Sequence, residues 1–416
     1  MSLYEDIEML CINAKTASSA LALANTEKKN ELLLKIADDL AASSVLIIEA
    51  NEKDLAAAKE REIPAPMLDR LTLNEARIMG ICDSLKELAK LEDPVGTGDG
   101  WSRPSGIDIK RVRVPLGVVA IIYEARPNVT VDSAALCLKT GNAVILRGGK
   151  EAIETNSVLV DIMKNALDEC GFNPHCVELV RSTERESANI LMSMRGYVDV
   201  LIPRGGKGLI SNVVENAKVP VIETGAGNCH LYVDETADID MAIKIAINAK
   251  CSRPSVCNAI ETMLVHASIA PKFLPLFANE AKKYGVEIRG CAKTKVLVPT
   301  AIEAQESDYE TEYNDLVLAV KVVNTVSEAI DHINKYSTAH SEAIVTQTHS
   351  IAEKFLNEVN SAAVYVNAST RFTDGGEFGF GAEIGISTQK LHVRGPMGLF
   401  ALTTEKYLIK GNGSIR

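Results

Sequence analysis

Cys257 lies where the sequence predicts a turn between two regular elements. The helix predicted over residues 236–250 is broken at Arg253-Pro254, because the residue before a proline is pushed out of helical geometry. An apolar run over 262–265 then predicts a strand. The thiolate is the reactive form of cysteine, and the nearby Arg253 favours it electrostatically. This pattern predicts a nucleophile that is both exposed and fixed in position.

A plainer interpretation of the same cysteine is a small, buried hydrophobic residue, which is how free cysteines usually pack. The chain has nine cysteines without paired spacing, and we interpret Cys251, at the end of the predicted helix, as part of the core. The residues by themselves leave both interpretations of Cys257 open. Scattered cysteines fit a reducing compartment. The sequence has no Cys-x-x-Cys pair and no His-Glu-x-x-His motif, so we expect no zinc site.

Two glycine-containing turns follow predicted strands. The first is Arg147-Gly148-Gly149, and the second, Arg204-Gly205-Gly206-Lys207, also opens a predicted helix. Main-chain N–H groups at such a turn, together with the start of a helix, favour a phosphate. Neither turn matches the Walker pattern or a clean Gly-x-Gly-x-x-Gly motif. A dinucleotide site of an unusual kind and two ordinary turns are therefore both compatible with the residues.

Strands and helices alternate from residue 118 onward. Continuous apolar runs are typical of buried parallel strands, and their alternation with helices predicts doubly wound parallel sheets. Ligands of such sheets bind at the carboxyl ends of the strands. The predicted strands are 118–123, 143–146, 177–180, 198–202, 219–222, 231–234, 262–265, 295–299, 316–323, 341–346 and 363–367.

The two ends of the chain have a different character. The first 92 residues predict helices, at 17–25, 27–48, 51–61 and 72–90, followed by a loop at 93–104. Residues 107–114 alternate as in a half-exposed strand of an arm, and 402–409 alternate as in an edge strand. Residues 368–398 are rich in glycine, and a loop this long favours a role in a site.

Composition sets limits on the function. A chain of 416 residues is long enough for two domains. The net charge of −11 argues against nucleic-acid binding. The first residues lack the pattern of a signal peptide, and no apolar segment is long enough to span a bilayer. We therefore expect a cytoplasmic protein that binds neither nucleic acid nor a membrane.

Several motifs occur in an order that resembles the aldehyde dehydrogenase superfamily, from about residue 10 to 405. They are Val-Pro-Leu-Gly-Val-Val-Ala-Ile-Ile-Tyr (114–123), Gly-Asn-Ala-Val-Ile-Leu-Arg-Gly-Gly (141–149), Glu-Thr-Gly-Ala-Gly-Asn (223–228) and Val256-Cys257. Five more motifs are similar to the gamma-glutamyl phosphate reductase family. These are Tyr-Glu-Ala-Arg-Pro-Asn (123–128), Ser-Arg-Pro-Ser-Val-Cys-Asn-Ala-Ile-Glu-Thr (252–262), His-Ser-Glu-Ala-Ile (340–344), Ser-Thr-Arg-Phe-Thr-Asp-Gly (369–375) and His-Val-Arg-Gly-Pro-Met-Gly-Leu (392–399).

The resemblance implies an α/β fold like that of the aldehyde dehydrogenases, with two doubly wound parallel-sheet domains and a small β oligomerisation arm. The expected domains are 1–228 for NADP(H) binding, with an arm strand near 105–114, and 229–392 for catalysis. Residues 393–416 are expected to return to the first domain and complete the arm. A homo-oligomer joined by strand pairing is expected as well.

The resemblance also implies a reaction, the NADPH-dependent reduction of L-glutamyl 5-phosphate to L-glutamate 5-semialdehyde and phosphate in proline biosynthesis. Cys257 becomes the expected nucleophile, which displaces phosphate and forms a thioester that hydride then reduces. The acyl phosphate is expected from a separate enzyme, so functional coupling to glutamate 5-kinase is a further expectation. The alternatives are a general aldehyde dehydrogenase that oxidises a free aldehyde and a catalytically silent protein of this fold.

The expected catalytic and substrate-binding residues depart from the broader superfamily at one place, where an Asn-Phe-Pro element is missing. Asn128 is expected either as a donor to the oxyanion or as a structural turn residue, and Arg126 faces the phosphate or the carboxylate. Glu223 matches the position of the general base. Because activated water would hydrolyse the thioester, we expect Glu223 near the thiol without being essential, or as an ordinary strand-end carboxylate. Arg371 is expected at the α-carboxylate of the substrate, or as a surface arginine.

The expected cofactor residues follow the same comparison. Arg147 replaces the superfamily lysine that holds the adenosine ribose, and its guanidinium suits the adenine ring or the 2′-phosphate of NADPH. Gly205, Gly206 and Lys207 match the turn beneath the pyrophosphate. Glu312 matches an acid that holds the nicotinamide ribose. His230 and His340 have no expected role beyond structure.

Overall fold

The computed structural model describes residues 2–124 and 126–416, without the side chains of residues 65, 66 and 207. Contacts divide the chain into two compact units. Unit 1 comprises Met1–Thr224, Gly379–Gly385 and Met397–Arg416, and unit 2 comprises Gly225–Phe378 and Ile386–Pro396. The predicted division at residues 228 and 392 stays a prediction, because cofactor binding and catalysis define it.

Helices form the N-terminal part of unit 1, as predicted. They are α1 (Leu3–Leu21), α2 (Thr26–Ala42), α3 (Ser44–Glu60), α4 (Ala65–Leu71) and α5 (Glu75–Lys90). The first helix begins well before residue 17, because the Ser2 hydroxyl accepts a hydrogen bond from the main-chain N–H of Glu5 and caps it. The single helix predicted over 27–48 is two helices, since Ser43 leaves helical geometry between them.

A parallel sheet of four strands forms the centre of unit 1, in the order β5-β4-β3-β6. Its strands are β3 (Val118–Tyr123), β4 (Ala143–Arg147), β5 (Val177–Leu179) and β6 (Val200–Arg204). The helices that follow them are α6 (Pro127–Lys139), α7 (Ile153–Glu169), α8 (Arg185–Ser193) and α9 (Lys207–Asn216). The structure confirms the predicted alternation of strands and helices in this part of the chain.

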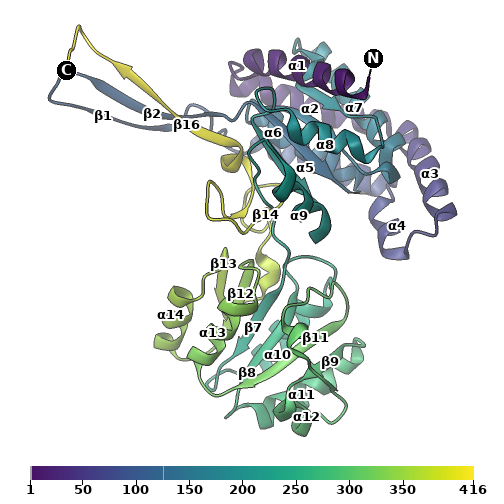
Figure 1. Ribbon diagram of the computed structural model, residues 1–416, viewed down its shortest axis with the longest axis vertical. Coiled ribbons are helices and arrows are strands. Elements are labelled where there is room, and N and C mark those ends of the chain that lie inside the picture. The colour runs from purple at the N-terminus through teal and green to yellow at the C-terminus, as the bar shows by residue number, and fades with distance from the viewer. Residues whose placement is uncertain (1, 125) are drawn as a thin grey trace. The chain divides into compact units, whose positions relative to one another are not determined.

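Helices cover both faces of this sheet (Figure 1). On one face, Ala120 and Ile122 of β3 share a buried cluster with Ile7 of α1. Successive side chains of a strand point to opposite faces. Tyr123 accordingly lies on the other face, where its hydroxyl is 2.6 Å from that of Thr130 in α6. Every residue of β3 is buried, as its continuous apolar run predicts.

Unit 2 is built around a parallel sheet of seven strands in the order β10-β9-β11-β8-β7-β12-β13. The strands are β7 (Cys229–Val233), β8 (Ile260–His266), β9 (Glu287–Gly290), β10 (Ile302–Glu303), β11 (Val317–Val323), β12 (Ser341–Val345) and β13 (Ala363–Val366). Its helices are α10 (Ile239–Cys251), α11 (Ala270–Lys283), α12 (Ala292–Leu297), α13 (Val326–Tyr336) and α14 (His349–Glu358).

Two predicted strands are wrong. Residues 295–299 overlap helix α12, in which Leu297 packs against the core while Val296 is 80% exposed. Residues 219–222 form no strand, because Val221 makes only an isolated bridge with Leu201 at the edge of the unit 1 sheet. A short run of apolar residues can be buried in either a helix or a strand. The apolar residues of these two segments therefore do not predict which element forms.

An antiparallel arm of three strands belongs to unit 1 and extends away from its helices (Figure 1). Its strands are β1 (Gly98–Ser102), β2 (Asp108–Pro115) and β16 (Thr403–Lys410). The strands predicted at 107–114 and 402–409 are confirmed, and β16 pairs with the whole of β2 at the edge of the arm. Strand β1 lies in the segment predicted as a loop. The glycine-rich segment 368–398 contains only short elements, including β14 (Ile386–Ser387) and β15 (Gly395–Pro396).

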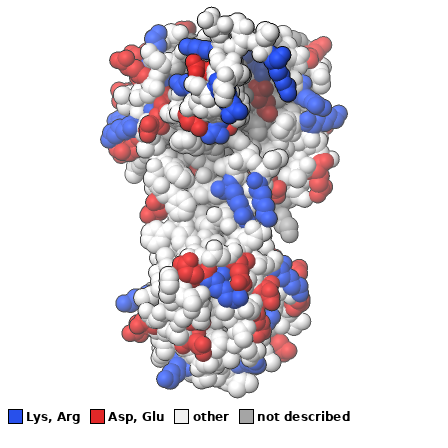
Figure 2. Space-filling view, turned by 90° about the vertical axis from the view of Figure 1, so that its left-hand side faces the viewer, with Lys and Arg blue, Asp and Glu red and all other residues white. Residues whose placement is uncertain are grey.

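The surface carries both signs of charge. On the face drawn in Figure 2, Lys and Arg side chains are interspersed with Asp and Glu over each unit. The expectation that the chain binds no nucleic acid stays a prediction. Among the described helices, none is both long and apolar enough to cross a membrane.

Candidate active site

Cys257 lies on a turn in unit 2, between the end of α10 at Cys251 and the start of β8 at Ile260. This confirms the predicted position between two regular elements. Its side chain is half-buried, whereas Ala259 and Ile260 after it are fully buried. Cys251 is half-buried as well, so its assignment to the core is only partly right. The turn therefore presents the Cys257 thiol at the end of a strand anchored in the core.

The main chain of Cys257 is fixed by strand β7 and the loop before it. The buried thiol of Cys229 donates to the carbonyl oxygen of Cys257 at 3.1 Å. Gly227 approaches the same carbonyl so closely that a Cβ on Gly227 would overlap it. The Gly227 N–H in turn donates to Oε1 of Glu312 at 2.7 Å. Glu312 therefore lies next to the segment that holds Cys257, and its expected contact with a ribose stays a prediction.

Asn258, the residue after the cysteine, binds the glycine-rich segment predicted to be a site loop. Its Nδ2 donates to the carbonyl oxygens of Arg371 at 3.3 Å and Thr373 at 2.9 Å. The Thr370 hydroxyl donates back to the carbonyl oxygen of Asn258 at 2.6 Å. Asn258 is 4% exposed, so these bonds are shielded from water. They hold residues 370–373 against the turn that carries Cys257.

The structure thus brings Arg371 to the nucleophile. Its guanidinium donates through Nε to the Ser252 hydroxyl at 3.1 Å and through Nη1 to Oδ1 of Asn258. Burial lowers the pKa of Arg371, the charge on Arg253 lowers it further, and Asp374 and Cys257 oppose the shift. Arg371 is therefore not a free surface arginine. It is a partly desolvated cation within electrostatic reach of Cys257.

A buried row of hydroxyl groups supports the segment that is bound to this turn. The Ser341 hydroxyl donates to that of Thr373 at 2.6 Å, and the Thr373 hydroxyl lies 2.7 Å from that of Tyr365. Nδ1 of His340 lies 2.8 Å from the Ser341 hydroxyl and 3.7 Å from the Cys229 thiol. The row ends at His340, which lies next to Cys229, and the Cys229 thiol binds the carbonyl of Cys257. His340 therefore has a structural role beside the site.

Two predicted site residues, the substrate-binding Arg126 and the catalytic Asn128, lie at the start of α6 in unit 1. Arg126 is the residue before the helix, and Asn128 follows Pro127 in its first turn. Nδ2 of Asn128 donates to Oδ2 of Asp132 at 3.2 Å. Burial raises the pKa of Asp132 to about 6, against the hydrogen bond from Asn128 and the charge of Arg204. One N–H of Asn128 thus has a partner within the helix, which fixes the orientation of the amide.

Arg147 ends strand β4, and its guanidinium binds the loop after β5. Nη2 donates to the carbonyl oxygens of Thr183 at 3.3 Å and Glu184 at 3.0 Å, and Nε donates to the Ser187 hydroxyl at 3.3 Å. Burial lowers the pKa of Arg147, and the charges of Glu151 and Tyr123 oppose this shift. Its expected contact with adenine or a 2′-phosphate stays a prediction, and these bonds place it at the loop that opens α8.

The glycine turn after β6 holds a carboxylate of the protein itself. The N–H of Gly206, at the start of α9, donates to Oε2 of Glu124 at 3.1 Å. A Cβ on Gly205 would lie only 2.7 Å from the same carboxyl group. The turn therefore offers an N–H to an anion, and a phosphate at this place stays a prediction. The side chain of Lys207, the third residue predicted here, lies outside the described part of the chain.

Glu223 is half-buried and is the second-last residue of the first segment of unit 1. The next residue, Thr224, is buried, and its hydroxyl donates to the carbonyl oxygen of Pro203 in β6 at 2.7 Å. This bond fixes the main chain that carries Glu223. Its role as a base or as an ordinary carboxylate stays a prediction.

Three residues that hold the site were not predicted as site residues: Asn258, Thr373 and Ser341. Each belongs to a motif quoted for the resemblance, in 252–262, 369–375 and 340–344, and the structure joins these three motifs by hydrogen bonds. Among the described residues, no group of three or more His, Cys, Asp or Glu side chains is arranged to hold a metal ion.

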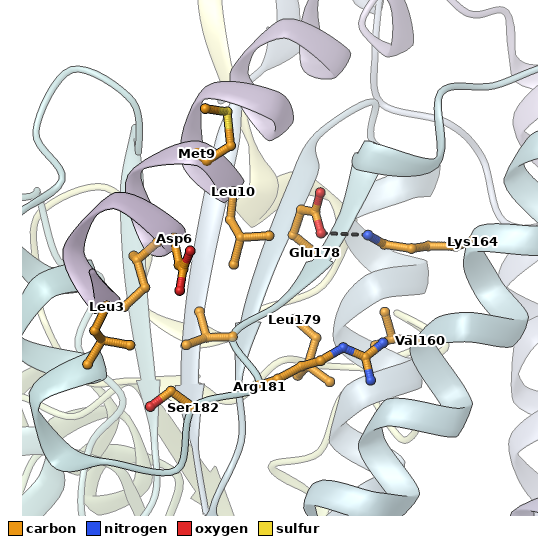
Figure 3. A pocket seen from close by; sticks show the side chains of 12 residues that line it. Leu3, Asp6, Met9, Leu10, Val160, Lys164, Glu178, Leu179, Arg181 and Ser182 are labelled. Atoms are coloured by element: carbon orange, nitrogen blue, oxygen red, sulfur yellow. Dashed lines mark hydrogen bonds and ion pairs between the residues drawn. The ribbon is translucent and has the colours of Figure 1, made fainter. Parts of the chain in front are cut away.

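Unit 1 also contains a cavity of about 400 Å³. Leu10 of α1, Val160 of α7 and Leu179 of β5 contribute to its apolar wall (Figure 3). The carboxylate of Glu178 at its side is already paired, with Nζ of Lys164 at 2.6 Å. No predicted site residue lines this cavity in the described part of the chain, so we do not assign the reaction to it.

Comparison with known proteins identifies the family. A model of the aldehyde dehydrogenase family matches residues 2–315. A gamma-glutamyl phosphate reductase from Carboxydothermus hydrogenoformans is 58% identical over 413 residues, which cover 99% of this chain and all of the relative. One from Clostridium perfringens is 57% identical, with 97% of each chain covered.

Solved structures agree with this result. The gamma-glutamyl phosphate reductase of Thermotoga maritima has a TM-score of 0.96 and 49% identity, with 99% of both chains covered. An acetylating aldehyde dehydrogenase from Geobacillus thermoglucosidasius, at 16% identity, has a TM-score of 0.71 and covers 100% of this chain and 98% of its own, a likeness of fold alone. The predicted aldehyde dehydrogenase-like α/β fold is confirmed. The chain belongs to the aldehyde dehydrogenase family and, within it, to the gamma-glutamyl phosphate reductases.

Proposed function

We propose that this protein reduces L-glutamyl 5-phosphate to L-glutamate 5-semialdehyde and phosphate with NADPH, the second step of proline biosynthesis. The observation that carries the proposal is the attachment of the Arg371 segment to the turn of Cys257 through Asn258. It sets a nucleophile and a cation side by side, as a substrate with an acyl group and a carboxylate requires. Relatives that cover the whole chain have the same name.

The first step is attack by the Cys257 thiolate on the acyl carbon. A carbon–sulfur bond forms, the carbon–oxygen bond to phosphate breaks, and phosphate leaves with the electron pair. Splitting the reduction into a substitution and a hydride transfer lowers each barrier. The contacts of Cys229 and Gly227 with the carbonyl of Cys257 hold the nucleophile in one orientation, and the Arg371 charge favours the thiolate.

The other predicted residues take the following roles in this proposal. Arg371 holds the α-carboxylate, and Arg126 faces an anionic group of the substrate. Asn128, oriented by Asp132, donates its second N–H to the oxyanion that forms in each step. Glu223 shapes the site without activating water.

A nicotinamide cofactor belongs to this family of oxidoreductases, and when bound it supplies the hydride that converts the thioester to the aldehyde. We propose NADPH as this cofactor. The carboxylate of Glu124 at Gly206 supports an anion site at the start of α9, where Gly205, Gly206 and Lys207 hold the pyrophosphate. Arg147 binds the adenosine end, and Glu312 binds the nicotinamide ribose.

We also propose that the protein is a cytoplasmic homo-oligomer joined through the arm. Strand β16 is an edge strand and carries exposed apolar side chains, with Tyr407 53% and Ile409 61% exposed. Such an edge pairs readily with another strand. The mass in solution tests this, since Ile409→Lys should give a smaller species. The acyl phosphate is labile, so glutamate 5-kinase is the proposed functional partner.

The reverse reaction tests the function directly. Glutamate semialdehyde and NADP⁺ are supplied with and without phosphate to the wild type, to Cys257→Ala and to Cys251→Ala, a matched control from the same stretch. We expect NADPH only with phosphate, in the wild type and the control but not in Cys257→Ala. NADPH formation without phosphate would identify a general aldehyde dehydrogenase. No turnover by a folded wild type would contradict the proposed substrate.

A separate variant tests the role of Arg371. Arg371→Lys keeps the charge and loses the fork that binds Ser252 and Asn258, so the KM for glutamate semialdehyde should rise by about tenfold or more. An aldehyde without the α-carboxylate should be turned over equally by both proteins. An equal loss on both aldehydes would show that Arg371 acts on the nucleophile instead.

A further inference from the structure

Arg204 is a half-buried cation at the end of β6 in unit 1. It is opposite Tyr123 of β3 in the register of the sheet, and its carbonyl oxygen accepts from the N–H of Glu124 at 3.2 Å. Arg204 therefore stands at the carboxyl ends of the parallel strands. This is the edge at which ligands of such sheets bind.

The guanidinium of Arg204 has no partner among the described residues. Its Nε is buried and makes no hydrogen bond, and its guanidinium forms no ion pair with any described residue. A guanidinium stays charged at any physiological pH. A buried N–H group without a partner is costly, and buried polar groups in native proteins nearly always have one. The structure thus leaves a set of N–H donors ready for an anion that the chain does not supply.

The surroundings of Arg204 indicate where this anion lies. The charge of Arg204 acts on Asp132, the same carboxyl group that binds Nδ2 of Asn128. The main chain of Gly385 lies close to this guanidinium, since a Cβ on Gly385 would be 3.2 Å from Nη1 of Arg204 and 2.8 Å from Cγ2 of Thr224. Arg204 and Asn128 share Asp132, whereas the turn at Gly206 is occupied by Glu124.

We propose that Arg204 binds the phosphoryl group of the acyl phosphate and the phosphate released from it. The inference rests on the proposed function. The charge of Arg204 acts on Asp132, the carboxyl group that orients Asn128, and Asn128 is the proposed oxyanion donor, so we assign the phosphoryl group on the same acyl carbon to Arg204. A planar guanidinium matches two phosphoryl oxygens, and charge-assisted hydrogen bonds of this kind are the strong ones.

This binding also assists the substitution. When the carbon–oxygen bond breaks, the bridging oxygen takes the electron pair and the phosphate gains negative charge. Donors already aimed at that charge lower the barrier without having to reorganise. In the opposite direction, the same donors hold inorganic phosphate for attack on the thioester, which regenerates the Cys257 thiolate. Arg204 transfers no proton in either direction.

The test compares Arg204→Met and Arg204→Lys with Arg195→Met, an exposed arginine of the same unit. In the reverse reaction we expect the KM for phosphate to rise about 10- to 100-fold in Arg204→Met, because bonds between charged groups are lost. The rise should be smaller in Arg204→Lys and absent in Arg195→Met. The KM for glutamate semialdehyde and the Kd for NADP⁺ should stay unchanged.

Thermal unfolding without substrates provides a second readout. Inorganic phosphate should raise the unfolding temperature of the wild type and of Arg195→Met, but not that of Arg204→Met. Without phosphate, Arg204→Met should be at least as stable as the wild type, because a buried N–H group without a partner is removed. If Arg204 instead stabilises the fold, Arg204→Met should unfold at a lower temperature than the wild type.

Three results would overturn the assignment. An unchanged KM for phosphate in both Arg204 variants, with a wild type that requires phosphate, would refute it and leave the proposed function intact. A higher Kd for NADP⁺ at unchanged KM for phosphate would assign the arginine to the phosphates of the cofactor. A wild type that needs no phosphate would instead refute the proposed function itself, and this inference with it.

Discussion

Gly227 leaves room for the carbonyl group of Cys257, and no other residue type fits there. A Cβ on Gly227 would overlap the carbonyl oxygen and carbon of the cysteine. The φ of Gly227 lies outside the left-handed range, so the space decides and the backbone conformation does not. The N–H of Gly227 is held by Glu312, so the glycine has little freedom to move away.

Gly227→Ala should therefore displace the nucleophile. A shift of about 1 Å at a reacting group costs on the order of a hundredfold in rate, so we expect kcat to fall by about that factor. Gly80→Ala is the matched control, because nothing lies near a Cβ at that helical position, and it should keep full activity. Equal kcat values for Gly227→Ala and the wild type would show that the turn adapts.

Glu124 competes with the cofactor for the start of α9, according to the proposal. Glu124→Gln removes the negative charge beside the Gly206 N–H, and this should lower the Kd for NADPH about two- to fivefold. Fluorescence titration measures the Kd. Glu215→Gln, near the other end of α9, should have no such effect. A weaker binding of NADPH by Glu124→Gln would indicate that the carboxylate supports the cofactor.

Lys250 and Glu261 form a buried ion pair next to the site, with Nζ and Oε2 2.5 Å apart and both side chains 1% exposed. Burial lowers the pKa of Lys250 and raises that of Glu261 to about 7. Glu261→Gln leaves a buried ammonium unpaired and should reduce the free energy of unfolding by about 3–5 kcal/mol. The double variant with Lys250→Met should regain most of the lost free energy of unfolding.

A double-mutant cycle with urea unfolding measures this coupling. The exposed pair of Lys354 and Glu358, at 2.9 Å, is the control and should give a coupling of about 0.5 kcal/mol. Additive effects of Lys250→Met and Glu261→Gln would contradict the expectation.

Asp132 should make stability depend on pH in a defined direction. Its pKa is raised from 3.8 to about 6 by burial, so the folded state retains a proton that the unfolded state releases. The stabilising contribution is complete below the unfolded pKa and is lost as pH rises through the folded one. Relative to Asp132→Asn, the wild type should therefore lose stability between about pH 4 and pH 7. Urea unfolding across this range, with the exposed Asp83→Asn as control, measures the difference.

The sequence predicts elements well where one physical signal dominates. The continuous apolar run at 118–123 becomes β3, and the break at Arg253-Pro254 ends α10 just before the turn of Cys257. Residues 295–299 fail because a short apolar cluster suits a helix and a strand equally. Strand β1 was missed because its residues are exposed and its partner is β2, so no burial pattern marks it.

The site is predictable in its residue types but not in its contacts. Cys257 and Arg371 were predicted from motifs more than a hundred residues apart, and only the fold shows that Asn258 joins them. The lack of a partner for Arg204 is equally invisible in the sequence, because it depends on every residue that packs around the side chain. Glu124 at the Gly206 N–H is a further contact of this kind.

The pairing of β2 with β16 has a consequence for the synthesis of the protein. Arg113 in β2 and Thr403 in β16 are hydrogen-bonded across 290 residues, and Asn142 binds the carbonyl oxygen of Leu402. Domains fold as units while the chain emerges from the ribosome, with the N-terminal part first. The edge of β2 therefore stays unpaired during translation until all of unit 2 has been synthesised. Unit 1 cannot complete its fold before that point.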